Sequence, residues 1–176
     1  MNIKKKYYSW ADVERMCVSI VNQMYMDNWR PEYIVGITRG GNVPATIISN
    51  MTGIRCEALK VALRDGESHQ ESNCWMAEDA FGYPDQDSGG QGKNILIVDD
   101  INDTGATFNW IKEDWQAGCL PGHEAWNHVW GNNVKFAVLT ENFSSKCNDV
   151  IYYCDEVNKE EENVWLVYPW ENVGQY

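Results

Sequence analysis

The stretch from Asn94 to Thr107 limits what this chain can fold into more than any other part of the sequence. Four apolar residues, Ile95–Val98, are followed directly by two acids, a pattern typical of a buried parallel strand that ends in a charged turn. A loop rich in Thr, Gly and Asp comes next, and the apolar periodicity that begins at Phe108 predicts a helix. Backbone N–H groups and the positive end of the helix dipole make such a junction a phosphate site. Carboxylates beside it suit sugar hydroxyls or a hard cation. The stretch therefore predicts a ligand that carries phosphate, a sugar and a metal ion.

The rest of the chain alternates between strand-like and helical patterns, which predicts an α/β fold with a mostly parallel twisted sheet and helices on both faces. Ser9, with Asp12 three residues on, is a capping-box variant ahead of a helix with an apolar face from Val13 to Met24. The other expected helices cover Asn42–Met51, ended by Gly53, and Thr104–Gln116. The expected strands are Tyr33–Thr38, Cys56–Leu63, Asn94–Val98, Val134–Thr140, Val150–Tyr153 and Val164–Val167, the last two finishing the sheet.

Length and charge narrow the class of protein. A chain of 176 residues fits one domain, covering 1–176. The net charge of −12 argues against a nucleic-acid partner, because such binding depends on Lys and Arg neutralising phosphates. Lys4–Lys6 is the one basic cluster, and we interpret it as a solvated tail. No apolar run has membrane-spanning length, and the six cysteines lack metal-site spacing. We therefore expect a soluble, cytoplasmic protein with free thiols and no membrane partner.

Two stretches interrupt the α/β rhythm. Residues 64–93 are polar, acidic and Gly-rich, and a segment of that length is either disordered or functional. The apolar residues within it, Cys74–Met76 and Phe81–Tyr83, favour a mobile lid that closes over bound substrate. Residues 117–133 contain two tryptophans at helical spacing, and we interpret them as an insertion that covers the core or contacts another subunit.

The acidic turn resembles a known family. Asp99–Thr107 (DDINDTGAT) is similar to the phosphoribosyl pyrophosphate (PRPP) signature of type I phosphoribosyltransferases. Tyr33–Pro44 (YIVGITRGGNVP) resembles the pyrophosphate loop of that family, and Trp165–Glu171 (WLVYPWE) resembles the base-stacking end of its bacterial xanthine–guanine branch. The resemblance covers about residues 7–171. It implies a Rossmann-like domain with a small hood and a lid, and a Mg²⁺-dependent transfer of phosphoribose from PRPP to a nucleobase, most closely a purine.

The resemblance also implies roles for individual residues on the PRPP side. Asp103–Thr107 would hold the 5-phosphate, with hydroxyls from Thr104 and Thr107, close backbone approach at Gly105, and Ala106 inside the same loop. Asp99 and Asp100 would meet the ribose hydroxyls and the Mg²⁺. Arg39 and Gly40 would hold the pyrophosphate, and relatives often have a strained peptide at the position matching Arg39-Gly40.

The acceptor side matches the family less well. Asp103 would orient or accept a proton on the imidazole ring of the base, although an Asp there can also serve as a helix N-cap. Trp165 would stack on the base, and the backbone at Leu166 would read its edge. Purine-using relatives normally have a Lys after the strand matching Val134–Thr140, whereas here Asn142 stands at that position. We expect Asn142 to contact the base and to discriminate less sharply for a 6-oxo group.

Three interpretations stay open at this point. The chain is an enzyme that transfers phosphoribose to a purine, an enzyme of the same chemistry with another acceptor base, or a non-catalytic PRPP or nucleotide sensor. By analogy with relatives, we expect a homodimer or homotetramer.

Overall fold

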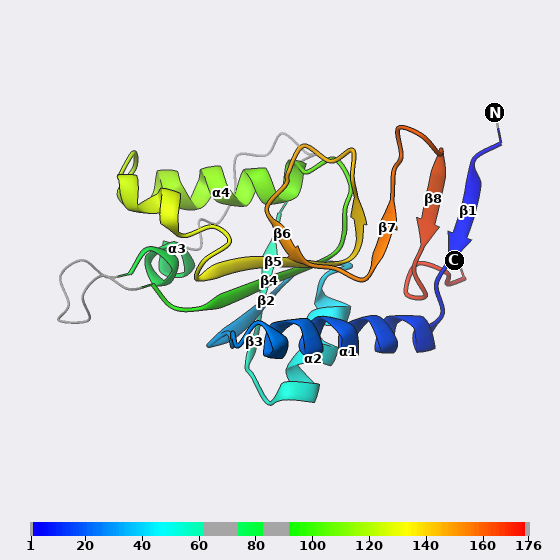
Figure 1. Ribbon diagram of the computed structural model, residues 1–176, viewed down its shortest axis with the longest axis horizontal. Helices are drawn as coiled ribbons and strands as arrows, with labels where there is room; N and C mark the ends of the chain where they lie inside the picture. The colour runs from blue at the N-terminus through cyan, green and yellow to red at the C-terminus, as the bar shows by residue number, and fades with distance from the viewer. Residues whose placement is uncertain (1, 62–73, 83–91, 175–176) are drawn as a thin grey trace.

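The computed structural model describes residues 2–61, 74–82 and 92–174, and its helices and strands alternate along most of the chain (Figure 1). The strands are β1 (Lys4–Tyr7), β2 (Tyr33–Thr38), β3 (Cys56–Lys60), β4 (Ile95–Asn102), β5 (Val134–Asn142), β6 (Val150–Tyr152), β7 (Asp155–Val157) and β8 (Val164–Val167). The helices are α1 (Trp10–Met26), α2 (Asn42–Thr52), α3 (Cys74–Phe81) and α4 (Ala106–Gly118), with a 3₁₀ turn, η1 (Glu124–His128).

The main sheet is parallel throughout, as the alternating pattern predicts. Its strands run in the order β3-β2-β4-β5-β6, and β7 pairs with β5 beyond the end of β6. The short strands β6 and β7 therefore extend along one neighbour as two separate segments. The helices α2, α3 and α4 form the crossovers between β2, β3, β4 and β5, and the 143–149 loop connects β5 to β6. Such long connections return the chain to the same end of the sheet.

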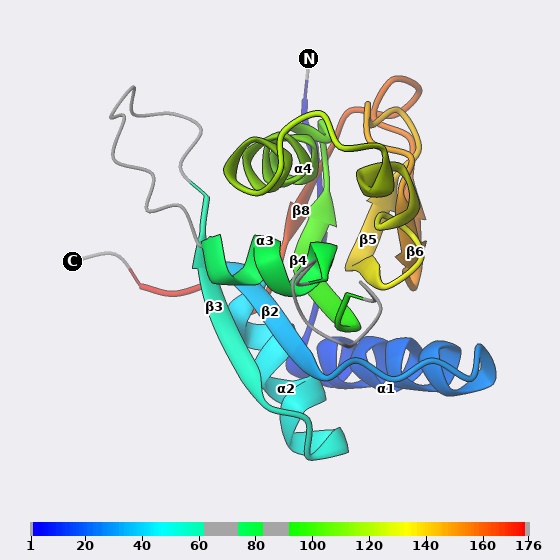
Figure 2. The same ribbon diagram turned by 90° about the vertical axis from the view of Figure 1, so that its left-hand side faces the viewer.

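Helices cover both faces of this sheet. Figure 2 shows α1 and α2 on one side and α3 and α4 on the other. The first face buries the α1 side chains from Val13 to Met24 against alternate residues of β4 and β5, among them Leu96 and Ala137. The opposite face is rich in aromatic residues, with Phe108, Trp115 and Phe136 in contact with the remaining strand residues. The two cores lie on opposite faces of the sheet. Successive side chains of β4 and β5 therefore face one core and then the other.

The predicted ends of the first two helices are confirmed. The Ser9 side chain accepts a hydrogen bond from the Asp12 backbone, and the Asp12 carboxylate accepts one from the Ser9 backbone. Gly53 ends α2 with a φ of 73°, a left-handed conformation that a residue with a Cβ adopts only at a cost.

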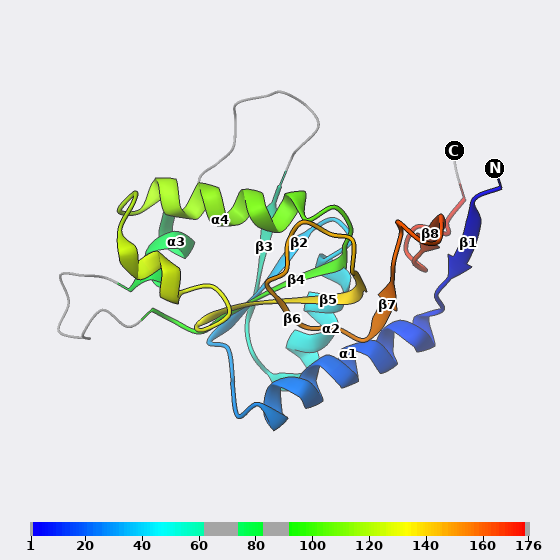
Figure 3. The same ribbon diagram turned by 45° about the horizontal axis from the view of Figure 1, so that its top comes forward.

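The N-terminal lysines form a strand, which corrects the expectation of a solvated tail. β1 pairs in parallel with β8, with Lys4 opposite Val164 and Tyr7 opposite Val167. The expectation that Val164–Val167 finishes the main sheet is also wrong, because β1 and β8 form their own two-stranded sheet. We call β1, β8 and residues 168–171 the hood; Figure 3 shows its strands beyond the end of α1.

The middle of the expected lid belongs to the core. Residues 74–82 contain α3, in which Met76, Ala77 and Ala80 are buried against the aromatic core. The helical spacing of these apolar residues is the sequence pattern that indicates a core helix, and the prediction of a lid did not use it. The remaining residues of 64–93 lie mostly outside the described part of the chain, and a lid formed by them stays a prediction. In the expected insertion, Trp126 and Trp130 stack at 5.8 Å over the same aromatic core.

Two expectations from composition can be compared with the described residues. Cys17, Cys56, Cys119, Cys147 and Cys154 are free thiols there. Among the helices of the described part, none combines the length and the apolar character needed to cross a bilayer.

A buried carboxylate lies between the ends of β4 and β5. Glu141 is 7% exposed, and its Oε1 accepts a hydrogen bond of 2.8 Å from the Asn102 amide. Its second oxygen, Oε2, is buried with no hydrogen-bond partner. Burial raises the pKa of Glu141 to about 7, and the Asn102 bond offsets part of that rise. Glu141 thus makes the folded state less stable once it is ionised.

We expect Met76→Ala to lower the free energy of unfolding by roughly 2–4 kcal/mol, the cost of emptying a buried site. Met76 is 1% exposed in α3. Urea denaturation measures this loss, with Glu78→Ala on the exposed face of α3 as the control. If α3 were part of a detached lid, both substitutions would have the same small effect.

We expect Glu141→Gln to stabilise the protein at pH 8 by roughly 1–3 kcal/mol but not near pH 4. The pKa of a Glu side chain in an unfolded chain is about 4.3. The pKa of Glu141 in the folded protein is about 7. Between those values the unfolded chain loses its proton first, so the wild type loses stability as pH rises, and the penalty is complete above pH 7. Denaturation curves of both proteins at the two pH values test this. A pH-independent difference would contradict it.

Candidate functional site

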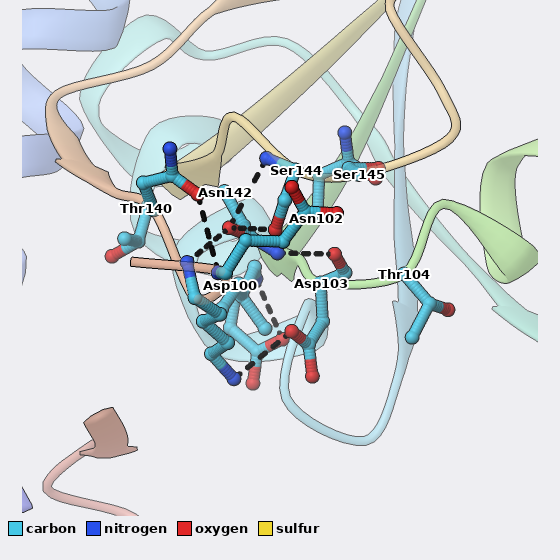
Figure 4. A network of polar contacts seen from close by, with 12 residues as sticks. Asp100, Asn102, Asp103, Thr104, Thr140, Asn142, Ser144 and Ser145 are labelled. Atoms are coloured by element: carbon cyan, nitrogen blue, oxygen red, sulfur yellow. Dashed lines mark hydrogen bonds and ion pairs between the residues drawn. The ribbon is translucent and has the colours of Figure 1, made fainter. Parts of the chain in front are cut away.

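The carboxyl ends of β2, β4 and β5 meet at one edge of the sheet, and the residues predicted for the site follow them. The parallel register places Asn102 of β4 opposite Glu141 of β5. The chain then continues into Asp103 from β4 and into the 143–147 loop from β5. Figure 4 shows Asp100, Asp103 and Asn142 close together at this edge. The crevice outside the strand ends is where open α/β sheets bind ligands.

Asp99 and Asp100 form a desolvated acid pair. Burial raises the pKa of Asp99 well above its usual range, and the charge of Asp100 raises it further. Burial also raises the pKa of Asp100. The Asp99 carboxylate accepts a hydrogen bond from the Asp100 backbone, and the Asp100 carboxylate accepts one from the Ile101 backbone at 2.8 Å. A bound cation or sugar hydroxyls would relieve this pair.

The loop after β2 packs directly against that pair. A Cβ at Gly40 would lie 2.1 Å from Asp100 Oδ2, so only a residue without a side chain fits. A Cβ at Gly41 would likewise lie 2.4 Å from the Val98 carbonyl oxygen. Arg39 is exposed. The cis peptide of this loop joins Thr38 and Arg39, one residue before the Arg39-Gly40 peptide that the resemblance suggested.

The predicted phosphate loop leads into α4. Gly105 caps the helix with a φ of 87°, and a Cβ there would lie 2.5 Å from the Cys147 backbone nitrogen. Thr104 Oγ1 accepts a hydrogen bond of 3.2 Å from the Ala106 backbone. Thr104 and Ala106 are exposed, and Thr107 is half-buried in the first turn. The helix N-terminus therefore opens to solvent at this loop, as the sequence pattern predicts.

The side chain of Asn142 joins three segments of the chain. Its amide nitrogen donates to the Asp103 carbonyl oxygen at 2.7 Å, and its Oδ1 accepts from Ser144 Oγ at 2.9 Å and from the Lys159 backbone at 3.0 Å. Asn142 is 3% exposed. These contacts occupy its oxygen and one of its two amide hydrogens, so they favour a role in joining the segments, and base binding by Asn142 stays a prediction.

A lysine from another segment reaches the site instead. Lys159 lies two residues after β7, and its Nζ is 2.9 Å from Asp103 Oδ1. Both residues line a cavity of about 530 Å³ together with Thr104, Asn109 and Lys146. The sequence did not indicate that Lys159 lies at the site. It is followed by a run of acids, and its position depends on the pairing of β7 with β5.

The hood contributes the C-terminal part of the site. Trp165 is 58% exposed on β8, and within the described residues its ring stacks on no other aromatic ring. Leu166 is buried. Burial and the charge of Asp100 raise the pKa of Glu171, while the Tyr168 backbone and the charge of Arg39 lower it. Glu171 therefore lies within electrostatic range of both predicted PRPP-binding loops.

The acid pair fits a metal ion that arrives with its ligand. Among the described residues, no three side chains of the His, Cys, Asp and Glu types form a ready-made metal cluster. Mg²⁺ usually binds one or two carboxylates and takes its other ligands from phosphates and water. Asp99 and Asp100, whose pKa values are both raised by burial, fit that limited role.

Comparison with known proteins agrees with this geometry. The phosphoribosyl transferase domain family matches residues 2–169. The chain is 25% identical to the hypoxanthine-guanine phosphoribosyltransferase of Schizosaccharomyces pombe, over 97% of this chain and 91% of that one, and 28% identical to the xanthine-guanine phosphoribosyltransferase of Cereibacter sphaeroides, over 85% and 75%. A purine phosphoribosyltransferase structure from Pyrococcus horikoshii superposes with a TM-score of 0.65 at 22% identity, over 98% and 97% of the two chains. The chain therefore belongs to the phosphoribosyl transferase domain family and is a phosphoribosyltransferase.

Proposed function

We propose that this protein transfers phosphoribose from PRPP to a 6-oxopurine base such as hypoxanthine, guanine or xanthine, with release of pyrophosphate. The observation that carries the proposal is the Asp103–Lys159 pair beside the phosphate loop. The printed names of the relatives, which are hypoxanthine-guanine and xanthine-guanine enzymes, support the same class of acceptor.

On the donor side, the phosphate loop would hold the 5-phosphate at the start of α4, and Arg39 with the Gly40 backbone would hold the pyrophosphate. Asp99 and Asp100 would accept hydrogen bonds from the ribose hydroxyls and hold Mg²⁺. When bound, that ion neutralises charge on the departing pyrophosphate. Burial raises the pKa values of both Asp99 and Asp100, and a bound cation would favour their ionised forms.

On the acceptor side, Asp103 and Lys159 offer a hydrogen-bond acceptor and a donor 2.9 Å apart. A 6-oxopurine carries the matching pair on one edge, namely the N7–H donor and the O6 acceptor. As the bond from N9 to C1 of ribose forms and the bond from C1 to pyrophosphate breaks, the N7 proton passes to the Asp103 carboxylate. Adenine would instead turn its amino group toward the Lys159 ammonium, which leaves two donors facing each other.

The hood would close the other side of the base. Trp165 is exposed and would stack on a purine ring, and the backbone at Leu166 would read its edge. This proposal replaces Asn142 with Lys159 as the residue that selects the 6-oxo group, and it predicts sharp rather than relaxed discrimination.

A panel of bases distinguishes this function from the two alternatives. Incubation with PRPP, Mg²⁺ and hypoxanthine, guanine, xanthine, adenine or a pyrimidine is followed by pyrophosphate release. Turnover with another base alone would favour a different acceptor, and PRPP binding without turnover would favour a sensor. A role in purine salvage, a cytoplasmic location and a homodimeric or homotetrameric assembly are part of the same proposal.

We expect Asp103→Asn to lower kcat by roughly 10²–10⁴, the usual effect of losing a general base, while PRPP binding is retained. The amide still occupies the loop but cannot accept the N7 proton. Pyrophosphate release gives kcat, and calorimetric titration with PRPP gives the affinity. Equal losses of affinity and turnover would contradict the catalytic assignment.

We expect Lys159→Met to lower kcat/KM for hypoxanthine and guanine by about 10- to 100-fold, the scale of a hydrogen bond to a charged group, and to leave adenine unchanged. Lys146→Met is the matched control, because Lys146 lines the same cavity on its Thr104 and Asn109 side. That control is expected to act on all bases equally. If Lys159→Met lowers kcat/KM for adenine as much as for hypoxanthine and guanine, the role of Lys159 in selecting the 6-oxo group would be contradicted.

A further inference from the structure

Asp100 is held through a single peptide group that two side chains contact from opposite sides. The N–H of the Asp100–Ile101 peptide donates to the Asp100 carboxylate at 2.8 Å. The carbonyl oxygen of the same peptide accepts a hydrogen bond of 3.0 Å from the Tyr168 hydroxyl. Since a peptide group is planar, a side chain that fixes its carbonyl also fixes the direction of its N–H.

The other oxygen of the carboxylate lies against the loop after β2. A Cβ on Gly40 would be 2.1 Å from Asp100 Oδ2, so this loop packs directly against that oxygen. One oxygen is therefore oriented by the peptide and the other is confined by the loop. The position of the carboxylate then depends on the position of that peptide plane.

Tyr168 is unusually well placed to hold the plane. It is 1% exposed, and its ring stacks between Tyr8 at 5.0 Å and Trp170 at 4.9 Å. Its hydroxyl also lies 2.8 Å from Thr140 Oγ1 at the end of β5. The hydroxyl donates toward both oxygens, but a carbonyl oxygen can only accept whereas the Thr140 hydroxyl can also donate, so the contact with Asp100 requires the hydrogen of Tyr168. Burial raises the pKa of Tyr168 well above its usual range, which keeps that hydrogen in place.

We propose that Tyr168 is a positioning residue that sets the Asp100 carboxylate for the Mg²⁺ complex of PRPP. The inference rests on the proposed function, in which Asp100 meets the ribose hydroxyls and the ion. It gives the hood a second role, because the segment that presents Trp165 to the base would also order the donor side of the site through Tyr168. Trp165 and Tyr168, which would have these two roles, belong to the same short segment of the hood.

Tyr168→Phe tests the proposal, because the ring stack is kept and only the hydroxyl is lost. We expect the affinity for PRPP in the presence of Mg²⁺ to fall about tenfold, the scale of one net hydrogen bond. The half-saturating Mg²⁺ concentration rises in parallel. Calorimetric titration without any base measures both, and the KM for the base is expected to stay unchanged.

Tyr8→Phe is the control for a purely structural effect. Tyr8 stacks on the same ring, and its hydroxyl lies 3.2 Å from the same Thr140 hydroxyl, but it does not contact Asp100 among the described hydrogen bonds. Both variants are expected to lower the melting temperature, whereas only Tyr168→Phe weakens PRPP. Equal weakening by both variants, or an equal rise in the KM values for PRPP and base, would overturn the proposal.

The outcome is separable from failure of the proposed function. If the wild type binds PRPP with Mg²⁺ but releases no pyrophosphate with any base, the transferase proposal fails, and the calorimetric comparison still tests Tyr168. If Tyr168→Phe binds PRPP as tightly as the wild type, the positioning role is overturned even where turnover is normal.

Discussion

The parallel pairing of β4 with β5 is the constraint on which the rest of the site depends. Its register places Asp99 opposite Val138 and Asn102 opposite Glu141. A slip of one residue would turn the acids toward the other face of the sheet and exchange the strand residues that fit each of the two cores. The buried apolar residues of both strands therefore hold the polar strand ends in place. The stability of the core thus sets the relative positions of the side chains in the candidate site.

Polar side chains at those strand ends then connect segments that are distant in sequence. Asn142 joins the phosphate loop to the segment that carries Lys159, and Thr140 meets the hood through Tyr168. Such buried contacts are stabilising only when each partner is present, because an unpaired buried polar group is costly. The donor and acceptor sides of the site thus share one hydrogen-bonded frame.

Local patterns predicted the parts of the fold that local physics controls. The capping box at Ser9 and the Gly53 helix end each depend on residues close in sequence, whereas the turn expected after Val98 is wrong, because strand β4 continues through both acids to Asn102. The predictions that were wrong concern segments whose contacts are with residues distant in sequence. The lysines of β1 look like a solvated tail until β8 pairs with them, and α3 looks like a polar loop because its apolar face is short. Lys159 and Tyr168 could not be assigned from the sequence, since their roles depend on side chains more than fifty residues away.

The hood joins the two ends of the described chain, which has a consequence for the order of folding. Its β1 residues pair with β8 residues far along the sequence, Lys4 with Val164 and Tyr7 with Val167, so this small sheet closes a long loop. A two-stranded sheet has little stability of its own and depends on docking to the finished domain. The main sheet can therefore assemble before the hood closes, and the surface proposed to receive a base is completed by that later step. Because it has few strands and a long closure, the hood is expected to open locally more readily than the main sheet.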